Sequence, residues 1–194
     1  MLKGDIRKFF ASIDHEVLIA ILRKYIDDTN TIGLLEEIIT SFSIKNTSKG
    51  LPLGNLTSQL LINIYMNEFD QFVKRTLKVT YYIRYADDFV IFHTRKGYLI
   101  ELILQLQSYL QDELKLTLHP DKLFIKPLSA GIDFLGWIHF PYHRVLRTST
   151  KRRMLNKLQQ NNSRESLASY RGLLRHGSTY KILLKLYELY SDNF

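Results

Sequence analysis

The sequence predicts an α+β fold, in which a small antiparallel sheet has helices packed on one face and more helices follow it. Residues 81–92 contain two runs rich in Tyr, Ile, Val and Phe on either side of Asp87 and Asp88, which is typical of a β-hairpin. Before and after this hairpin, apolar residues recur at helical spacing. The segment 149–194 has a concentration of Lys and Arg and predicts three short helices.

The composition is that of a globular protein with a basic surface. The 194 residues are 45% hydrophobic and 24% charged, and none is cysteine, which excludes disulfides and thiolate zinc sites. A transmembrane run of about 18 apolar residues and the apolar core of a signal peptide are both absent, so we expect a cytoplasmic protein with no membrane partner. The net charge of +8 suggests an anionic polymer as partner.

The other elements are predicted from caps, apolar spacing and turn residues. In chain order they are a strand at 1–6, a helix from an Asp14 N-cap to about 25, a helix at 32–42, a loop at 46–55, a helix capped by Thr57 or Ser58 and ending near 75, the hairpin, a helix at 96–113, a strand region at 114–125 interrupted at 119–122, and a second hairpin that pairs 134–140 with 145–147.

The acidic pair in the hairpin points to cation binding. A turn needs one Asp at most, and two adjacent carboxylates repel each other unless a cation lies beside them. A solvated polar turn is the alternative for an isolated Asp-Asp pair. The apolar flanks of Asp87 and Asp88 hold the turn against a core, and this favours a metal site.

Five short segments, taken in order, resemble the motifs of the reverse transcriptase palm. They are 4–10 (GDIRKFF), 51–59 (LPLGNLTSQ), 85–88 (YADD), 119–122 (HPDK) and 134–137 (FLGW). A single four-letter motif recurs by chance, whereas five motifs in the family's order and spacing are a specific signal. The form of the second segment looks most like that of bacterial reverse transcriptases from diversity-generating retroelements.

The resemblance implies a polymerase palm with a ferredoxin-like sheet and two-metal nucleotidyl transfer. Asp5 and Asp87 would be the principal ligands of Mg²⁺, with Asp88 as auxiliary ligand and Mn²⁺ as a substitute ion. Lys122 would protonate or neutralise the leaving pyrophosphate, and a solvated surface lysine is the alternative.

Four residues would bind the incoming nucleotide by the same resemblance: Ile6, Phe10, Gly54 and Gln59. Phe10 would exclude a 2′-hydroxyl and so select deoxynucleotides, whereas its alternative role is core packing. Gly54 permits a close backbone approach next to a helix N-terminus. Loop flexibility for Gly54 and capping support for Gln59 remain open alternatives.

The resemblance also implies contacts to primer and template, at Leu53, Phe134, Leu135, Gly136, Lys151, Arg152 and Arg153. Leu53 replaces a residue that is polar in most relatives, so low fidelity is a hypothesis. Phe134 to Gly136 would form the primer grip, with Trp137 in the core. The basic helices would follow the duplex through its phosphates.

We therefore predict a palm at 1–126, a primer-grip hairpin at 127–148 and a partial helical thumb at 149–194. In the family, a fingers subdomain precedes the first motif, and only four residues precede Asp5 here. We expect the fingers to be missing and the 194 residues alone to have weak or no polymerase activity. The implied partners are an RNA template, a DNA primer or hybrid duplex, a dNTP, the missing fingers segment and a small basic accessory protein.

Two other functions compete with a polymerase. A truncated, non-catalytic nucleic-acid-binding remnant would keep the fold without the chemistry, but all three carboxylates are present. A nucleotide cyclase on a related fold would have Gly-Gly before the acidic pair, where this chain has Tyr85 and Ala86.

Overall fold

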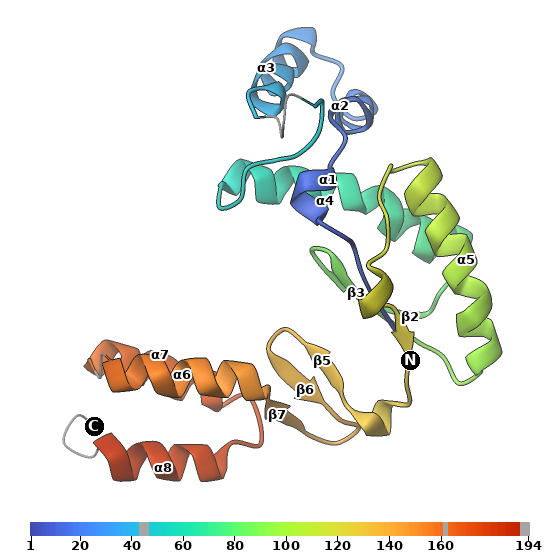
Figure 1. The fold of residues 1–194 in the computed structure, drawn as a ribbon. Helices are drawn as coiled ribbons and strands as arrows, with labels where there is room; N and C mark the ends of the chain where they lie inside the picture. The colour runs from blue at the N-terminus through green and yellow to red at the C-terminus, as the bar shows by residue number, and fades with distance from the viewer. Residues whose placement is uncertain (43–46, 161–162, 191–194) are drawn as a thin grey trace. The chain divides into compact units, whose positions relative to one another are not determined.

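The computed structural model describes residues 1–42, 47–160 and 163–190. The chain forms two compact units, residues 1–125 and 126–194, and each mixes helices with an antiparallel sheet (Figure 1). The predicted α+β class is confirmed. The second unit contains both a small sheet and the C-terminal helices, so the finer division into hairpin and thumb stays a prediction. No helix in the described ranges combines the length and the apolar character that a membrane span needs.

The sheet of the first unit has four antiparallel strands in the order β2-β3-β1-β4. These are β1 (Leu2–Asp5), β2 (Tyr81–Tyr85), β3 (Asp88–Phe92) and β4 (Phe124–Ile125). The predicted hairpin is β2 and β3. Because β1 pairs with β3, the N-terminal strand lies in the middle of the sheet beside the hairpin, although about 80 residues separate them in sequence.

The helices described in the first unit are α1 (Phe9–Ser12), α2 (His15–Arg23), α3 (Thr29–Thr40), α4 (Leu56–Gln71), which continues as a π-helix over Phe72–Thr76, and α5 (Lys96–Asp112). Of these, α4 and α5 cover one face of the sheet, whereas α2 packs against α4 and α3 packs against α2 (Figure 1). Phe69 of α4 packs edge-on against Phe89 of β3, with ring centroids 5.4 Å apart. Successive side chains alternate across a strand, so Lys3, Asp5 and Asp88 lie on the other face.

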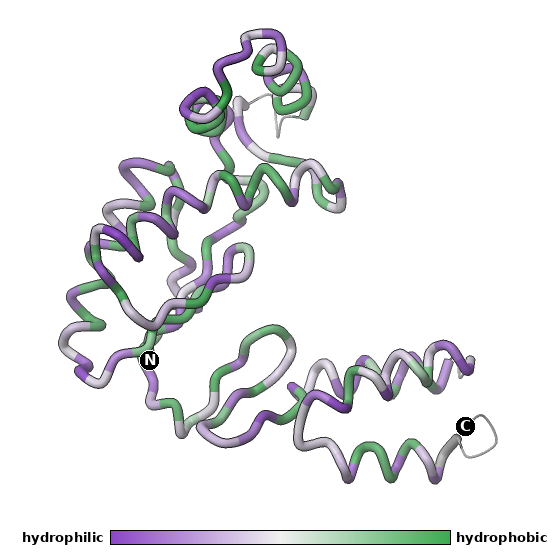
Figure 2. The backbone as a smooth tube through the Cα atoms, turned by 180° about the vertical axis from the view of Figure 1, so that it is seen from behind, coloured by the Kyte–Doolittle hydropathy of each residue, from purple (hydrophilic) through white to green (hydrophobic). Residues whose placement is uncertain are grey.

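The second unit is built on a three-stranded sheet of β5 (Ile132–Phe134), β6 (Trp137–His139) and β7 (Arg144–Leu146). Three helices follow: α6 (Thr148–Gln160), α7 (Arg164–Leu174) and α8 (Tyr180–Tyr190). Their apolar sides enclose a separate core around Trp137, Met154, Leu158 and Leu174. The alternation of apolar and polar positions along the helices of both units is visible in Figure 2.

Caps explain where two helices begin. Asp14 accepts a hydrogen bond from Val17 N, as predicted for an N-cap. The helix expected at 32–42 begins at Thr29 instead, because the side chain of Asp28 caps it by accepting from Thr31 N at 2.7 Å. The helix expected to be capped by Thr57 or Ser58 has Asn55 as its N-cap residue, so these two residues lie inside its first turn.

Two predicted strands are wrong in part. In the region 114–125, the predicted interruption at 119–122 is present as a 3₁₀ turn over residues 120–122, and Phe124 and Ile125 form a strand. Residues 114–118 do not form the predicted strand and contribute only an isolated bridge between Leu118 and Ile6. The strand expected at 134–140 is interrupted by a tight turn at Leu135 and Gly136, whose φ angles are 53° and 81°. This turn separates β5 from β6 and adds a third strand to the predicted hairpin.

Candidate active site

Three acidic residues lie at one end of the first sheet. Asp5 ends β1 and lies directly opposite Asp88, the first residue of β3. Asp87 immediately precedes Asp88 in the hairpin turn, where Ala86 has a left-handed φ of 52°. Ile6 N donates a hydrogen bond to Asp87 O at 3.2 Å and so ties the end of β1 to the turn. The antiparallel register therefore brings the two acidic motifs together.

Two lysines contact these carboxylates. Lys122 Nζ lies 2.9 Å from Asp5 Oδ2, and Lys3 Nζ lies 3.2 Å from Asp88 Oδ2. The Lys122 turn is held beside β1 by a hydrogen bond of 2.7 Å from His119 N to Asp5 O. The sequence motifs predicted a role for Lys122 but not for Lys3, because Lys3 lies outside those motifs and its partner is 85 residues away.

The remaining carboxylate oxygens suit a divalent cation. Asp5 Oδ1 and Asp88 Oδ1 are buried and accept no hydrogen bond. A buried anionic oxygen without a donor is costly, and hard cations such as Mg²⁺ bind such oxygens. Across residues 1–42, 47–160 and 163–190, however, no three acidic, His or Cys side chains are gathered closely enough to enclose a metal ion. The donor set fits a cation that is also held by water and substrate, as Mg²⁺ usually is.

Three side chains in the site, those of Asp87, Asp88 and Lys122, have raised pKa values. Burial, together with the negative charge of Asp5, raises the pKa of Asp87. Burial also raises the pKa of Asp88, although the nearby Lys3 opposes that change. The hydrogen bond to Asp5 raises the pKa of Lys122, so its ammonium group keeps its proton at neutral pH. A bound cation would relieve the repulsion among the three carboxylates.

Gly4 allows Asp5 to take its position. A Cβ atom at Gly4 would lie 2.3 Å from Cζ of Phe89, because the Phe89 ring packs directly over the glycine backbone. Phe89 of β3 is fully buried, and its ring packs against Phe69 of α4. The Gly-Asp sequence thus lets the core approach one face of β1 while the next side chain, that of Asp5, lies on the opposite face.

The hairpin turn is held by a partly buried ion pair that the sequence patterns did not predict. Arg84 binds Asp70 of α4 through two bonds, Nε to Oδ1 at 2.8 Å and Nη2 to Oδ2 at 2.7 Å. Arg84 Nη1 also donates to Ala86 O at 2.9 Å, and Tyr82 donates its hydroxyl to Asp70 Oδ1 at 2.6 Å. An arginine inside an apolar strand was the available signal, since such a residue needs a buried partner.

Comparison with known proteins identifies the chain. A family model described as reverse transcriptase (RNA-dependent DNA polymerase) matches residues 1–139. The chain belongs to the reverse transcriptase family. This match extends over β1, the acidic hairpin and the Lys122 turn, and into the second unit as far as β6.

Several curated relatives are similar to the chain. Protein YkfC of Escherichia coli K12 is 28% identical over 90% of this chain. Group II intron-encoded protein LtrA of Lactococcus lactis is 25% identical over 70%, and a putative COX1/OXI3 intron 2 protein of Saccharomyces cerevisiae is 22% identical over 74%. The matches span 55%, 34% and 25% of those proteins. The narrower likeness to reverse transcriptases of diversity-generating retroelements stays a prediction.

The predicted nucleotide-binding residues lie on two segments that the backbone joins. Leu51 N donates to Phe10 O at 2.8 Å, so the loop before α4 is fastened to the segment after β1. Phe10 is half-buried. Ile6 is only 1% exposed, so its side chain belongs to the core and its backbone alone faces the turn.

The loop after Leu51 is open to solvent. Leu53 is 77% exposed, and Gly54 has a φ of 90° that favours glycine. Gln59 is exposed in the first turn of α4, where the Asn55 side chain makes no capping hydrogen bond. The helix N-terminus therefore keeps backbone N–H groups without a side-chain cap.

The predicted primer-grip residues lie in the second unit, at the β5–β6 turn. Phe134 is half-buried, whereas Leu135 is 53% exposed at the tip of the turn. Gly136 O accepts from Arg147 N at 3.0 Å, which fixes the turn against the chain leading into α6. Trp137 is buried against Gly177, and this agrees with the core role that we predicted for it.

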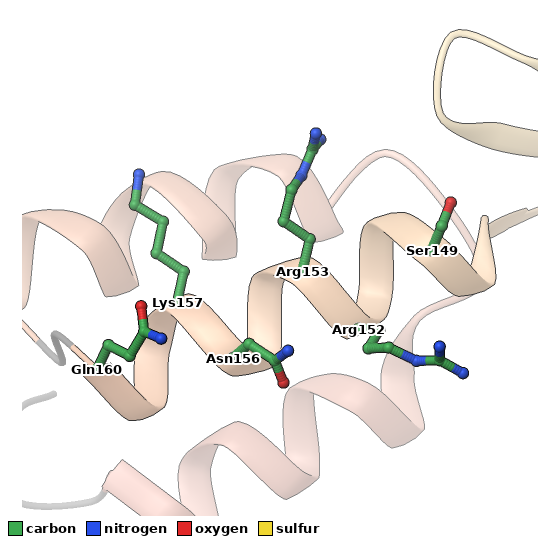
Figure 3. A pocket seen from close by; sticks show the side chains of 6 residues that line it. All are labelled: Ser149, Arg152, Arg153, Asn156, Lys157 and Gln160. Atoms are coloured by element: carbon green, nitrogen blue, oxygen red, sulfur yellow. The ribbon is translucent and has the colours of Figure 1, made fainter.

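The basic residues of α6 surround a shallow pocket. Its lining is Ser149, Arg152, Arg153, Asn156, Lys157 and Gln160. Figure 3 shows Arg153 and Lys157 projecting to one side of the helix and Arg152 to the other. Lys151 is exposed next to them, and α6 contains no acidic residue. This helix therefore presents positive charge and amide groups without a local counter-charge.

Proposed function

We propose that the chain carries the catalytic centre of an RNA-directed DNA polymerase, which adds a dNTP to a primer 3′-hydroxyl on an RNA template. The observation that carries the proposal is the meeting of Asp5, Asp87 and Asp88 at one end of the sheet, in a chain of the reverse transcriptase family. Polymerases of this kind rely on positioned carboxylates and metal ions.

Asp5 and Asp87 would hold Mg²⁺ as principal ligands, with Asp88 as auxiliary ligand, and Mn²⁺ would substitute. The unpartnered, buried oxygens of Asp5 and Asp88 support cation binding at these two residues, whereas the role of Asp87 rests on the family resemblance. When bound, the ions supply activation of the primer hydroxyl and stabilisation of the charge on pyrophosphate. The protein contributes the fixed placement of the carboxylates, because β1 and the hairpin are locked by the sheet register and by Arg84.

Lys122 would donate a hydrogen bond or a proton to the leaving pyrophosphate. Its side chain is 53% exposed, and its bond to Asp5 keeps the ammonium protonated and aimed at the acidic centre. A flexible lysine of this kind can turn from the carboxylate to a newly formed pyrophosphate and donate a hydrogen bond or a proton to it.

The remaining roles concern the substrates. Ile6, Phe10, Gly54 and Gln59 would line the dNTP site, with the half-buried ring of Phe10 excluding a 2′-hydroxyl. The primer and the template would be contacted by a second set, which is Leu53, Phe134, Leu135, Gly136, Lys151, Arg152 and Arg153. The basic α6 supports phosphate contacts that are independent of sequence and sensitive to salt.

Extension of a labelled DNA primer on an RNA template, with Mg²⁺ or Mn²⁺, tests the proposal. We expect product from the parent chain, supplied with a fingers segment if one is required, and none from Asp87→Ala. A matched control is Asp27→Ala, which removes an exposed carboxylate between α2 and α3. Product from Asp87→Ala equal to that of the parent would refute the assignment.

A non-catalytic nucleic-acid-binding remnant is the second candidate, and the basic surface of α6, a helix without acidic residues, favours it. It predicts binding of an RNA–DNA duplex that is unchanged by chelation of metal and unchanged in Asp87→Ala, with no extension under any condition. The fingers segment, the small basic accessory protein and a bacterial cytoplasmic location stay predictions.

A further inference from the structure

The two lysines at the acidic centre differ in how firmly they are held. Lys122 comes from a 3₁₀ turn outside the sheet, and its side chain is 53% exposed. Lys3 lies on the central strand β1, where Val90 of β3 and Phe124 of β4 are its direct neighbours, and its side chain is only 11% exposed. Lys122 can therefore move into solvent, whereas Lys3 is fixed beside Asp88.

A fixed ammonium group changes what Asp88 can do. Lys3 Nζ donates a hydrogen bond of 3.2 Å to Asp88 Oδ2, so Oδ1 is the one oxygen of that carboxylate without a partner. Asp88 then cannot bind a cation through both oxygens, and part of its charge is already neutralised. Moving Lys3 away would leave a buried charge unpaired, which is costly. Asp5 has no such restriction, because the lysine on it is exposed.

We propose that Lys3 is a positioning residue that neutralises Asp88 permanently and confines strong divalent-cation binding to Asp5 and Asp87. This inference rests on the proposed metal centre and explains why one of the three carboxylates would be auxiliary. Lys3 precedes the Gly-Asp segment that carries the family resemblance. The lysine lowers the negative charge of the site and so weakens its attraction for a divalent ion.

A titration of the full 194-residue chain with Mn²⁺ tests this inference. Binding is measured by electron paramagnetic resonance, as the decrease of the signal from free Mn²⁺. We expect Lys3→Met to bind Mn²⁺ about tenfold more tightly than the parent, because Asp88 becomes available. Asp88→Asn should weaken binding by less than about threefold in the parent but by about tenfold in Lys3→Met, which is the coupling expected of two groups in contact. Asp87→Asn should weaken the binding of Mn²⁺ by more than about tenfold relative to the parent.

Two further variants keep the test decisive if Lys3→Met does not fold. Lys3→Gln retains a hydrogen-bond donor without the charge and should resemble Lys3→Met, whereas Lys3→Arg keeps the charge and should bind within about twofold of the parent. Equal effects of Asp88→Asn and Asp87→Asn in the parent, or unchanged or weaker binding in the uncharged Lys3 variants, would overturn the inference while leaving the metal centre intact. No saturable Mn²⁺ binding by the parent would instead contradict the proposed metal centre itself.

Discussion

Replacement of Arg84 by Met removes the interactions that hold the acidic hairpin in shape while preserving much of the side-chain length. Three hydrogen bonds are lost, two to Asp70 and one to Ala86 O. Asp70 keeps only the hydroxyl of Tyr82 from this network. The turn that contains Asp87 then loses its link to α4, so the change acts on both stability and the site.

The size of the effect follows from burial. The Arg84 side chain is 9% exposed and that of Asp70 is 28% exposed. Breaking a buried ion pair by removing one partner costs about 3–5 kcal/mol, and an exposed pair contributes about 1 kcal/mol or less. Because Asp70 retains some water contact, we expect the free energy of unfolding to fall by about 3 kcal/mol, at the lower end of the buried range.

Urea unfolding of Arg84→Met and of the parent measures this loss. We expect the dependence of the free energy of unfolding on urea concentration to be the same in both proteins. Arg23→Met is the matched control, because Arg23 also pairs with a carboxylate, that of Glu36, but its side chain is 61% exposed. The control should lose about 1 kcal/mol or less. Adding Asp70→Asn to Arg84→Met should recover part of the loss, because the buried charge left behind is then removed. Equal losses in Arg84→Met and Arg23→Met would mean that the Arg84–Asp70 pair stabilises the fold no more than an exposed pair does.

Three other predictions concern separate features. Gly4→Ala should lower the free energy of unfolding by about 2 kcal/mol in the same urea assay, because its Cβ would lie 2.3 Å from the buried Phe89 ring, and Gly97→Ala, where a Cβ meets nothing, should not. Leu53→Gln should reduce misincorporation in a primer-extension fidelity assay, and an unchanged error spectrum would reject the low-fidelity hypothesis. The bonds from Thr31 lower the pKa of Asp28, so its stabilisation of α3 is complete above the unfolded pKa and is lost as pH falls through the folded value. Helical circular dichroism during acid titration should show this loss in the parent and not in Asp28→Asn.

Local patterns predicted the elements whose residues contact one another within a short stretch of chain. The hairpin at 81–92 follows from two runs of β-favouring residues on either side of the acidic pair, and the Asp14 cap from the apolar spacing after it. The turn at Leu135 and Gly136 was missed because a positive φ at leucine is uncommon, so the apolar run around it predicted a continuous strand. The interruption at 119–122 was predicted from Pro120 and its neighbours, and residues 120–122 form a 3₁₀ turn there.

The partners in the site were harder to predict, because the fold joins them across long separations. Lys3 and Asp88 are 85 residues apart, and Lys122 and Asp5 are 117 apart. No helical or strand period connects such pairs. Lys122 was identified through the family resemblance, whereas Lys3 lies outside those motifs and became visible only once β1 was placed between β3 and β4.

The most direct test of the central claim is metal-dependent primer extension by matched variants. With an RNA template, a DNA primer, dNTPs and a supplied fingers segment, we predict Mg²⁺-dependent product from the parent and from Asp27→Ala. We predict no product from Asp5→Asn or Asp87→Ala, which lack the principal carboxylates of the site. Extension that survives either of the latter substitutions at the parent's rate would contradict the claim that these carboxylates form the catalytic centre.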